Sequence, residues 1–168
     1  MQGDGDGWSA GPDGTRRWGR HGAAGLVLVD TRGDEPSVLL QHRATWTAEG
    51  GTWGVPGGAR DSHETAAEAA VREAVEEAGI DTTLIDVRAE LVTAGPFPAD
   101  PRRPELAGQW TYTTIVATAD GQIPVTPNEE SLELRWVGLG ELENYPLLPA
   151  FAESWPNVYQ VIRKLLSS

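Results

Sequence analysis

The chain has 168 residues, the size of one domain, and its lack of cysteine excludes disulfide bridges and thiolate metal sites. Its net charge of −12 opposes binding to a nucleic-acid polymer, because a negative surface repels phosphate backbones. With 39% hydrophobic and 23% charged residues it has a globular composition, without a long apolar run or the N-terminal features of a secretory signal. We therefore expect a cytoplasmic protein with no membrane partner.

The predicted elements begin after an N-terminal tail, residues 1–19, which is rich in Gly and Asp and is expected to be flexible. Residues 20–168 form the expected domain. Strands are predicted where aliphatic, β-branched or aromatic residues dominate: residues 22–30, 37–43, 53–55, 83–94, 109–119 and 132–137. The other predicted elements are loops at 95–108 and 120–128, a helical turn at 139–145 and an amphipathic helix at 149–166.

A further helix is predicted from residue 65 to residue 78, where Ala, Glu, Val and Arg dominate without Gly or Pro. We expect Asp61 to cap its start, with Glu64 completing a pair like a capping box. Gly79 stands where a helix end requires the left-handed conformation. Small apolar residues at helical spacing form a stripe suited to packing on a sheet: Ala67, Ala70, Val71, Ala74 and Ala78.

Three glutamates are neighbours on this helix: Glu73, Glu76 and Glu77. They are predicted to lie on the side opposite the apolar stripe. Because like charges at this spacing repel one another, their presence indicates a balancing positive group. Arg72 lies four residues before Glu76, at the spacing of an intrahelical ion pair. Converging carboxylate oxygens also suit Mg²⁺ or Mn²⁺, so the sequence predicts a divalent-metal site here.

Residues 58–80 resemble the Nudix box, G-x5-E-x7-R-E-U-x-E-E-x-G-U, in which U is an aliphatic residue. Every fixed position is filled: Gly58, Glu64, Arg72, Glu73, Glu76, Glu77 and Gly79, with Ala74 and Ile80 at the U positions. The preceding residues 53–58, WGVPGG, are similar to the W-x-x-P-G-G segment of small MutT-like members. The strand pattern extends the resemblance to residues 21–165. It implies an α/β sandwich, a mixed β-sheet flanked by helices, with the box as a loop-helix-loop.

The resemblance also implies a hydrolase that cleaves a phosphoanhydride in a nucleoside diphosphate linked to another moiety. Its cofactor, Mg²⁺ or Mn²⁺, neutralises the charge that protects such a bond, positions the diphosphate and activates water. Glu73, Glu76 and Glu77 are the implied metal ligands and catalytic residues. The carbonyl of Gly58 is a further ligand, since a glycine turn lets backbone oxygen approach an ion. Arg72 is implied to orient a box carboxylate.

The roles of two further groups stay open. Glu64 either caps the helix or orients groups near its start. The general base is either a box glutamate or a carboxylate of a later loop, where Glu129 and Glu130 are the candidates. The alternative for Glu129 and Glu130 is a solvated acidic turn.

Substrate-binding residues are expected outside the box. Arg43, at the end of a predicted strand, offers a bidentate fork to phosphate, and its alternative role is a surface charge. Four aromatic residues are suited to stacking on a base, with a place in the core as the alternative for each: Trp46, Trp53, Trp110 and Tyr112.

The compact chain and its short Pro-Gly-Gly segment favour MutT-like hydrolysis of a nucleoside triphosphate to a monophosphate and pyrophosphate. The first alternative is cleavage of ADP-ribose or another nucleotide sugar, by members that usually carry a larger N-terminal domain. The second is a non-catalytic nucleotide sensor, although such domains commonly lose box glutamates that this chain keeps. The expected partner is therefore a small-molecule nucleotide, and the sequence leaves a homodimer open.

Overall fold

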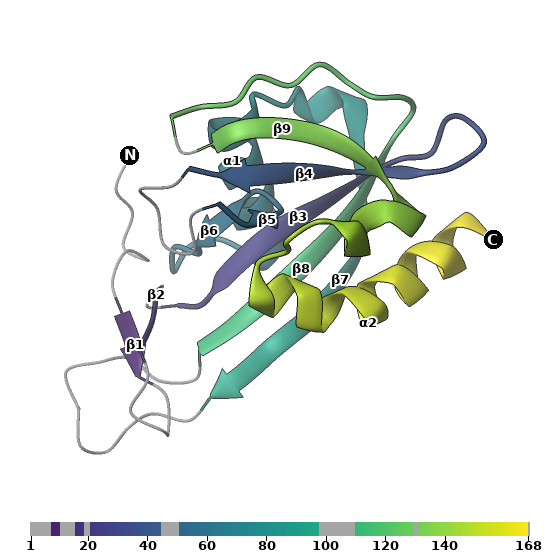
Figure 1. Cartoon of the computed structure of the whole chain (residues 1–168). Helices are drawn as coiled ribbons and strands as arrows, with labels where there is room; N and C mark the ends of the chain where they lie inside the picture. The colour runs from purple at the N-terminus through teal and green to yellow at the C-terminus, as the bar shows by residue number, and fades with distance from the viewer. Residues whose placement is uncertain are drawn as a thin grey trace.

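The computed structural model describes residues 8–10, 16–18, 21–44, 51–97, 110–129 and 131–167. Its centre is a seven-stranded sheet with the order β5-β4-β3-β8-β7, in which β6 also pairs with β3 and β9 with β4 (Figure 1). The strands are β3 (Ala23–Asp30), β4 (Ser37–Arg43), β5 (Trp53–Gly54), β6 (Gly57–Ala59), β7 (Ile85–Phe97), β8 (Trp110–Ala119) and β9 (Ser131–Gly138). β3 and β8 are parallel and the other pairs are antiparallel, so the sheet is mixed.

Two α-helices cover the two faces of this sheet (Figure 1): α1 (Ala66–Ala78) and α2 (Pro149–Leu166). Because alternate side chains of a strand point to opposite faces, Leu28 and Leu39 pack in the cluster under α1 while Val29 and Leu40 pack under α2. The 3₁₀ helices η1 (Thr82–Leu84) and η2 (Leu139–Asn144) complete the described helices, none of which is long and apolar enough to cross a membrane. The predicted α/β sandwich with a mixed sheet is confirmed.

Most predicted elements appear with small shifts at their ends, and two differences matter. The glycines of the Pro-Gly-Gly segment begin a strand, β6, in which Gly57 and Gly58 pair with Gly25 and Ala24 of β3. β7 continues to Phe97, three residues into the predicted loop, and residues 98–109 lie outside the described part. Glycine backbones carry no side-chain signal for a strand, which is why β6 was not predicted.

Two short strands lie within the predicted N-terminal tail. β1 (Trp8–Ala10) and β2 (Arg16–Trp18) pair in an antiparallel sheet of their own. The other residues of the tail lie outside the described part of the chain. The predicted boundary between tail and domain stays a prediction.

α1 packs against the sheet through small side chains: Ala69, Ala70, Ala74 and Ala78 are all fully buried. The predicted stripe was partly wrong, because Ala67 and Val71 are only half-buried and Ala69 belongs to the buried face. Glu77 also lies on this face and is only 5% exposed. The prediction that the three glutamates lie opposite the apolar stripe was therefore wrong. They extend from its edge.

The start of α1 also differs from the prediction. Thr65, not Asp61, is the N-cap: its hydroxyl accepts from the Glu68 amide at 3.1 Å, and the Glu68 carboxylate accepts from the Thr65 amide at 2.9 Å. One turn earlier, the Asp61 amide donates to the Glu64 carboxylate and the Glu64 amide donates to the Asp61 backbone carbonyl, both at 3.0 Å. Of the two successive capping patterns in the sequence, only Thr65 and Glu68 form a complete capping box, and it begins the helix. Gly79 ends it with φ of 64°, as predicted.

The new N-cap generates a stability prediction. Replacing Thr65 by Ala leaves the Glu68 amide without its acceptor, so the free energy of unfolding should fall by about 1 kcal/mol. Urea denaturation measures this change. Thr65→Ser keeps the acceptor and serves as the matched control, with stability close to the original. Equal stability of the Ala and Ser variants would contradict the assigned cap.

Candidate functional site

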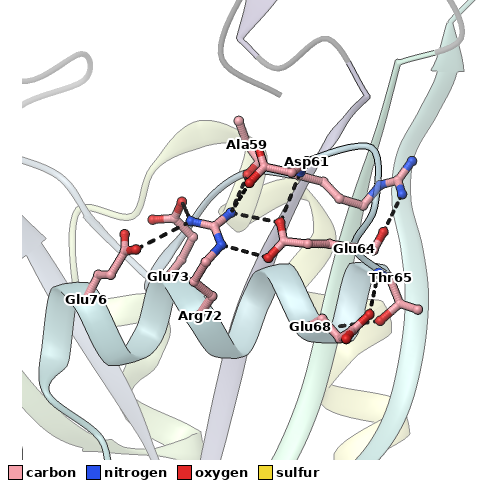
Figure 2. A network of polar contacts seen from close by, with 9 residues as sticks. Ala59, Asp61, Glu64, Thr65, Glu68, Arg72, Glu73 and Glu76 are labelled. Carbon is pink, nitrogen blue, oxygen red and sulfur yellow. Dashed lines mark hydrogen bonds and ion pairs between the residues drawn. The ribbon is translucent and has the colours of Figure 1, made fainter. Parts of the chain in front are cut away.

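Arg72 is the centre of a polar network on α1 (Figure 2). Its Nε donates to Glu64 Oε2 at 2.7 Å and its Nη2 donates to Glu64 Oε1 at 3.0 Å, which forms a bidentate fork. Nη1 donates to Glu73 Oε1 at 2.9 Å and lies 3.6 Å from Glu76 Oε1. Nη2 also donates to the Ala59 carbonyl at 3.0 Å. One cation therefore joins the loop before α1, the strand β6 and two carboxylates of α1.

The network keeps both main partners ionised. The hydrogen bonds from Arg72 lower the pKa of the Glu64 carboxyl below its ordinary value. The same bonds raise the pKa of the Arg72 guanidinium. The Arg72 and Glu64 side chains are only 23% and 8% exposed, so solvent screens this pair less than a surface ion pair. Arg72 is thus the positive group that balances the crowded glutamates.

Glu73 rests directly against a glycine of β6. A Cβ atom added at Gly58 would lie 2.6 Å from the carboxyl carbon of Glu73 and 2.7 Å from its Oε1. Real Cβ atoms do not approach other atoms so closely, so only glycine leaves space for this carboxylate. The glycine that opens the motif is therefore explained by a close approach between β6 and α1.

Glu77 is held from the same strand. The Gly57 amide donates to Glu77 Oε2 at 2.9 Å. The Tyr112 hydroxyl packs on this segment, because a Cβ atom at Gly57 would lie 3.1 Å from it and one at Gly25 would collide with it. Burial raises the pKa of the Tyr112 phenol and the nearby Glu77 carboxylate raises it further, whereas Arg43 lowers it. Tyr112, Glu77 and Arg43 thus influence one another in a single region.

The C-terminal end of α1 is covered by the loop before β9. The last carbonyls of a helix have no partner within the helix and need donors from elsewhere. Here the loop supplies three donors: Thr126 N to Ala78 O at 2.8 Å, Asn128 N to Glu77 O at 3.2 Å and Asn128 Nδ2 to Glu76 O at 3.3 Å.

The hydrogen bonds of this loop to α1 bear on the position of the predicted carboxylate Glu129. Glu129 is exposed and directly follows Asn128, which is hydrogen-bonded to the backbone of the box glutamates. Glu130 lies outside the described residues. Glu129 therefore lies in a segment held beside the C-terminal end of α1.

Trp53 lies in the core, the alternative that the sequence left open for this residue. It is 6% exposed and belongs to the core cluster under α2. His42 stacks on its ring at 4.4 Å, Tyr145 meets it edge-on at 5.2 Å, and the Arg135 guanidinium lies 5.2 Å from its centre. The ring is thus occupied by contacts within the protein.

Of the other candidate substrate-binding residues, the structure describes the side chains of Arg43 and Tyr112. Arg43 ends β4 and is half-buried, and Tyr112 lies near the start of β8 with its hydroxyl over the β6 glycines. Trp46 lies outside the described residues. Trp110 begins β8, but its side chain is outside the described part. Arg43 and Tyr112 thus lie near Glu77, and the substrate-binding roles of Arg43, Tyr112, Trp46 and Trp110 stay predictions.

Gln41 was not among the residues predicted from the sequence. This residue of β4 is 2% exposed and shares the face of Leu39, toward α1. Its Nε2 donates to Ser131 Oγ at 2.7 Å, while its buried Oε1 accepts no hydrogen bond from the residues that the structure describes. An unpaired buried acceptor costs about 1–3 kcal/mol. The available signal was a glutamine directly after three apolar residues of the predicted strand, Val38 to Leu40.

Among the described residues, a group with metal-ligand atoms within 4.8 Å of one another is formed by Asp61, His63 and Glu64, not by Glu73, Glu76 and Glu77. However, the Glu64 oxygens already accept bonds from Arg72 and from the Asp61 amide, and Arg72 Nη2 lies 3.9 Å from Asp61 Oδ2. The Arg72 guanidinium thus lies within ion-pair distance of two of the three residues, Asp61 and Glu64. This group therefore serves to hold Arg72.

The donors expected from the sequence fit a hard divalent cation better. Carboxylate and backbone oxygens are the ligands that such ions prefer. Glu73 is seated against Gly58, and Glu77 is fixed by the Gly57 amide, so these carboxylates are already positioned beside the backbone of β6. The space left by the absent Cβ of Gly58 is a feature that a structural helix alone does not require.

Comparisons with known proteins agree with this geometry. A family model described as the NUDIX domain matches residues 19–160. The Mycobacterium tuberculosis protein named "Putative 8-oxo-dGTP diphosphatase 3" is 53% identical over 156 residues, which cover 92% of this chain and 69% of that protein. The "Nucleoside triphosphate pyrophosphatase/Nudix hydrolase fusion protein" of Bifidobacterium longum is 39% identical over 158 residues, which cover 90% of this chain and 30% of the fusion.

A solved structure is also similar over nearly the whole chain. The Nudix hydrolase RenU from M. smegmatis has 47% sequence identity and a TM-score of 0.86, covering 95% of this chain and 96% of RenU.

The Arg72 network generates a pH-dependent stability prediction. Arg72→Ala leaves Glu64 charged and poorly solvated, so the free energy of unfolding should fall by about 2–3 kcal/mol at neutral pH. Because folding lowers the pKa of Glu64, this interaction stabilises the protein above the ordinary carboxyl pKa of 4.5 and is lost as pH falls through the lowered value. The difference between Arg72→Ala and the original chain should therefore shrink in acid.

Urea denaturation at several pH values between about 7 and about 3 measures this difference. Arg163→Ala is the control. Arg163 is an exposed arginine of α2 whose side chain donates to the Tyr159 hydroxyl and not to a carboxylate, so this variant should show a small difference at every pH. A large loss for Arg72→Ala that does not change with pH would contradict the proposed pairing.

Proposed function

Because this chain belongs to the Nudix family, we propose that it hydrolyses a nucleoside triphosphate to the monophosphate and pyrophosphate, consuming one water. The observation that carries the proposal is the complete box, joined around Arg72 and seated on the glycines of β6. The substrate that we propose is 8-oxo-dGTP, which the name of the M. tuberculosis relative specifies. That relative is similar over 92% of this chain, so the likeness includes residues outside the box.

The proposed ligands for a divalent cation, Mg²⁺ or Mn²⁺, are the Gly58 carbonyl and the carboxylates of Glu73, Glu76 and Glu77. When bound, the ion neutralises charge on the diphosphate and activates water for its cleavage. The other contributions come from the chain itself. The Gly57 amide stabilises the charged form of Glu77 and restrains its carboxylate.

Arg72 and Glu64 have positioning roles in this proposal. Glu64 holds the guanidinium in a fork, and the remaining N–H groups of Arg72 orient Glu73 and attract Glu76. The Glu76 side chain is 41% exposed, so it retains freedom to turn toward a ligand. Preorganised carboxylates reduce the rearrangement needed during the reaction.

We assign the general base to the loop carboxylates Glu129 or Glu130, with a box glutamate as the alternative. Arg43 supplies a bidentate contact to phosphate, and the neutral Tyr112 phenol supplies a donor. The positive charge of Arg43 matters because the chain as a whole carries a net charge of −12 and repels phosphate.

The proposed function first predicts the products of the reaction. A panel of 8-oxo-dGTP, dGTP, ATP, ADP-ribose, a dinucleoside polyphosphate and a nucleotide sugar is incubated with Mg²⁺ or Mn²⁺, and the products are separated by chromatography. We expect monophosphate and pyrophosphate, with kcat/KM for 8-oxo-dGTP at least about 10-fold above that for dGTP. Preferred cleavage of ADP-ribose or the nucleotide sugar would replace the triphosphate proposal. Binding without turnover across the panel indicates a sensor.

The second prediction concerns the glutamates. Glu76→Gln and Glu77→Gln should each lower the rate at least about 10²-fold while the circular dichroism spectrum is retained, because each removes a charged oxygen without changing shape. Glu68→Gln, on the same helix, preserves the capping box and should keep full activity. Unfolding of the Glu76 or Glu77 variants would point to a structural role instead.

The third prediction concerns Gly58. In Gly58→Ala the new methyl group displaces the Glu73 carboxylate, so Mn²⁺ affinity measured by electron paramagnetic resonance should fall at least about 10-fold. Gly54→Ala is the matched control, because its Cβ would meet only Leu148 at an ordinary 3.7 Å. Equal Mn²⁺ affinity in both variants would argue against Glu73 as a ligand.

A further inference from the structure

The loop before β9 is held at one end by α1. Asn128 donates its backbone amide to Glu77 O at 3.2 Å and its side-chain amide to Glu76 O at 3.3 Å. These carbonyls belong to the two residues whose carboxylates are proposed to act in hydrolysis. The position of Asn128 is therefore set by the backbone that also sets those carboxylates.

The same loop is held at its other end by β4. The Ser131 amide donates to Asn128 O at 3.2 Å, which closes the turn that contains Glu129. Ser131 Oγ accepts from Gln41 Nε2 at 2.7 Å. Gln41 is buried, and Arg43 follows two residues later at the end of the same strand. A path of hydrogen bonds thus runs from the end of α1, through the loop, to the strand that carries Arg43.

We propose that Gln41, Ser131 and Asn128 are positioning residues for the reaction, and we name them the loop brace. The loop brace holds Asn128, Glu129 and Ser131 in place relative to the box glutamates and Arg43. The proposal rests on the hydrolase function above and adds three residues that the box does not contain. None of the three is expected to touch the substrate; they act through the loop carboxylates.

The chemistry of Gln41 argues against a purely stabilising role. It shares its face of the sheet with Leu39, and its register partner in β9 is Leu134. An aliphatic side chain at this position would remove the buried, unpaired Oε1 at the cost of a single hydrogen bond. A glutamine that stability does not require is consistent with a function that needs the bond to Ser131.

The loop brace is tested with Gln41→Leu and Ser131→Ala. Ser131→Thr retains the hydroxyl and is the conservative variant. Ser154→Ala is the matched control, because Ser154 is also buried and hydrogen-bonded but belongs to α2, on the other face of the sheet. For each variant kcat and KM for the nucleoside triphosphate, the thermal midpoint and the amide hydrogen exchange of residues 126–131 are measured, the last two without nucleotide.

We expect Gln41→Leu and Ser131→Ala to lower kcat about 10-fold and to change KM less than about twofold, because positioning of the base is lost while binding groups remain. The thermal midpoint of Gln41→Leu should equal or exceed that of the original chain. Exchange at the Asn128 and Ser131 amides should accelerate at least about 10-fold in both variants. Ser131→Thr should recover kcat to within about threefold of the original.

Unchanged kcat in Gln41→Leu and Ser131→Ala, in an enzyme that hydrolyses the triphosphate normally, overturns the loop brace and leaves the proposed function intact. A loss of kcat that follows a loss of thermal midpoint across all variants, Ser154→Ala included, also overturns it. If the original chain hydrolyses no nucleotide, the proposed function fails, and the exchange data alone decide whether the loop is held by Gln41. Unchanged exchange then overturns the loop brace as well.

Discussion

The bidentate contact between Arg72 and Glu64 is the interaction on which the site depends. α1 presents three carboxylates within two turns, an arrangement that would repel itself without a compensating cation. Arg72 supplies that charge, and Glu64 and the Ala59 carbonyl hold it at the N-terminal side of the cluster. Because Glu64 belongs to the loop and Ala59 to β6, the same residue also fixes how the helix meets the sheet.

The close approach of α1 to β6 depends on what the side chains lack. Ala70, Ala74 and Ala78 let the helix axis lie near the strands, and Gly58 leaves the space that the Glu73 carboxylate fills. The Gly57 amide is then close enough to hydrogen-bond Glu77. The small residues of α1 and the glycines of β6 are therefore both needed for the close approach of the helix to the strand. A larger side chain on either surface would separate the carboxylates from the backbone that positions them.

Much of this site was accessible from the sequence because local patterns determine it. The spacing from Gly58 to Gly79 identified the box, propensity identified α1 and α2, and β-branched residues identified most strands. The errors have physical reasons. Asp61 and Thr65 both begin capping patterns, and propensity does not choose between them. An aromatic residue such as Trp53 fits a core or a binding surface equally well, and only its neighbours decide.

The sequence by itself determined the chemistry of this protein: which residues can carry charge, their order along α1 and the family to which they belong. Tertiary structure alone decided which of them meet. Gln41 and Ser131 are 90 residues apart in the chain, and Asn128 is 52 residues from Glu76, yet each pair shares a hydrogen bond. Contacts at such separations arise from the pairing of β4 with β9 and the return of the loop to α1. Sheet pairing is a collective outcome of packing, so no local pattern of residues encodes it.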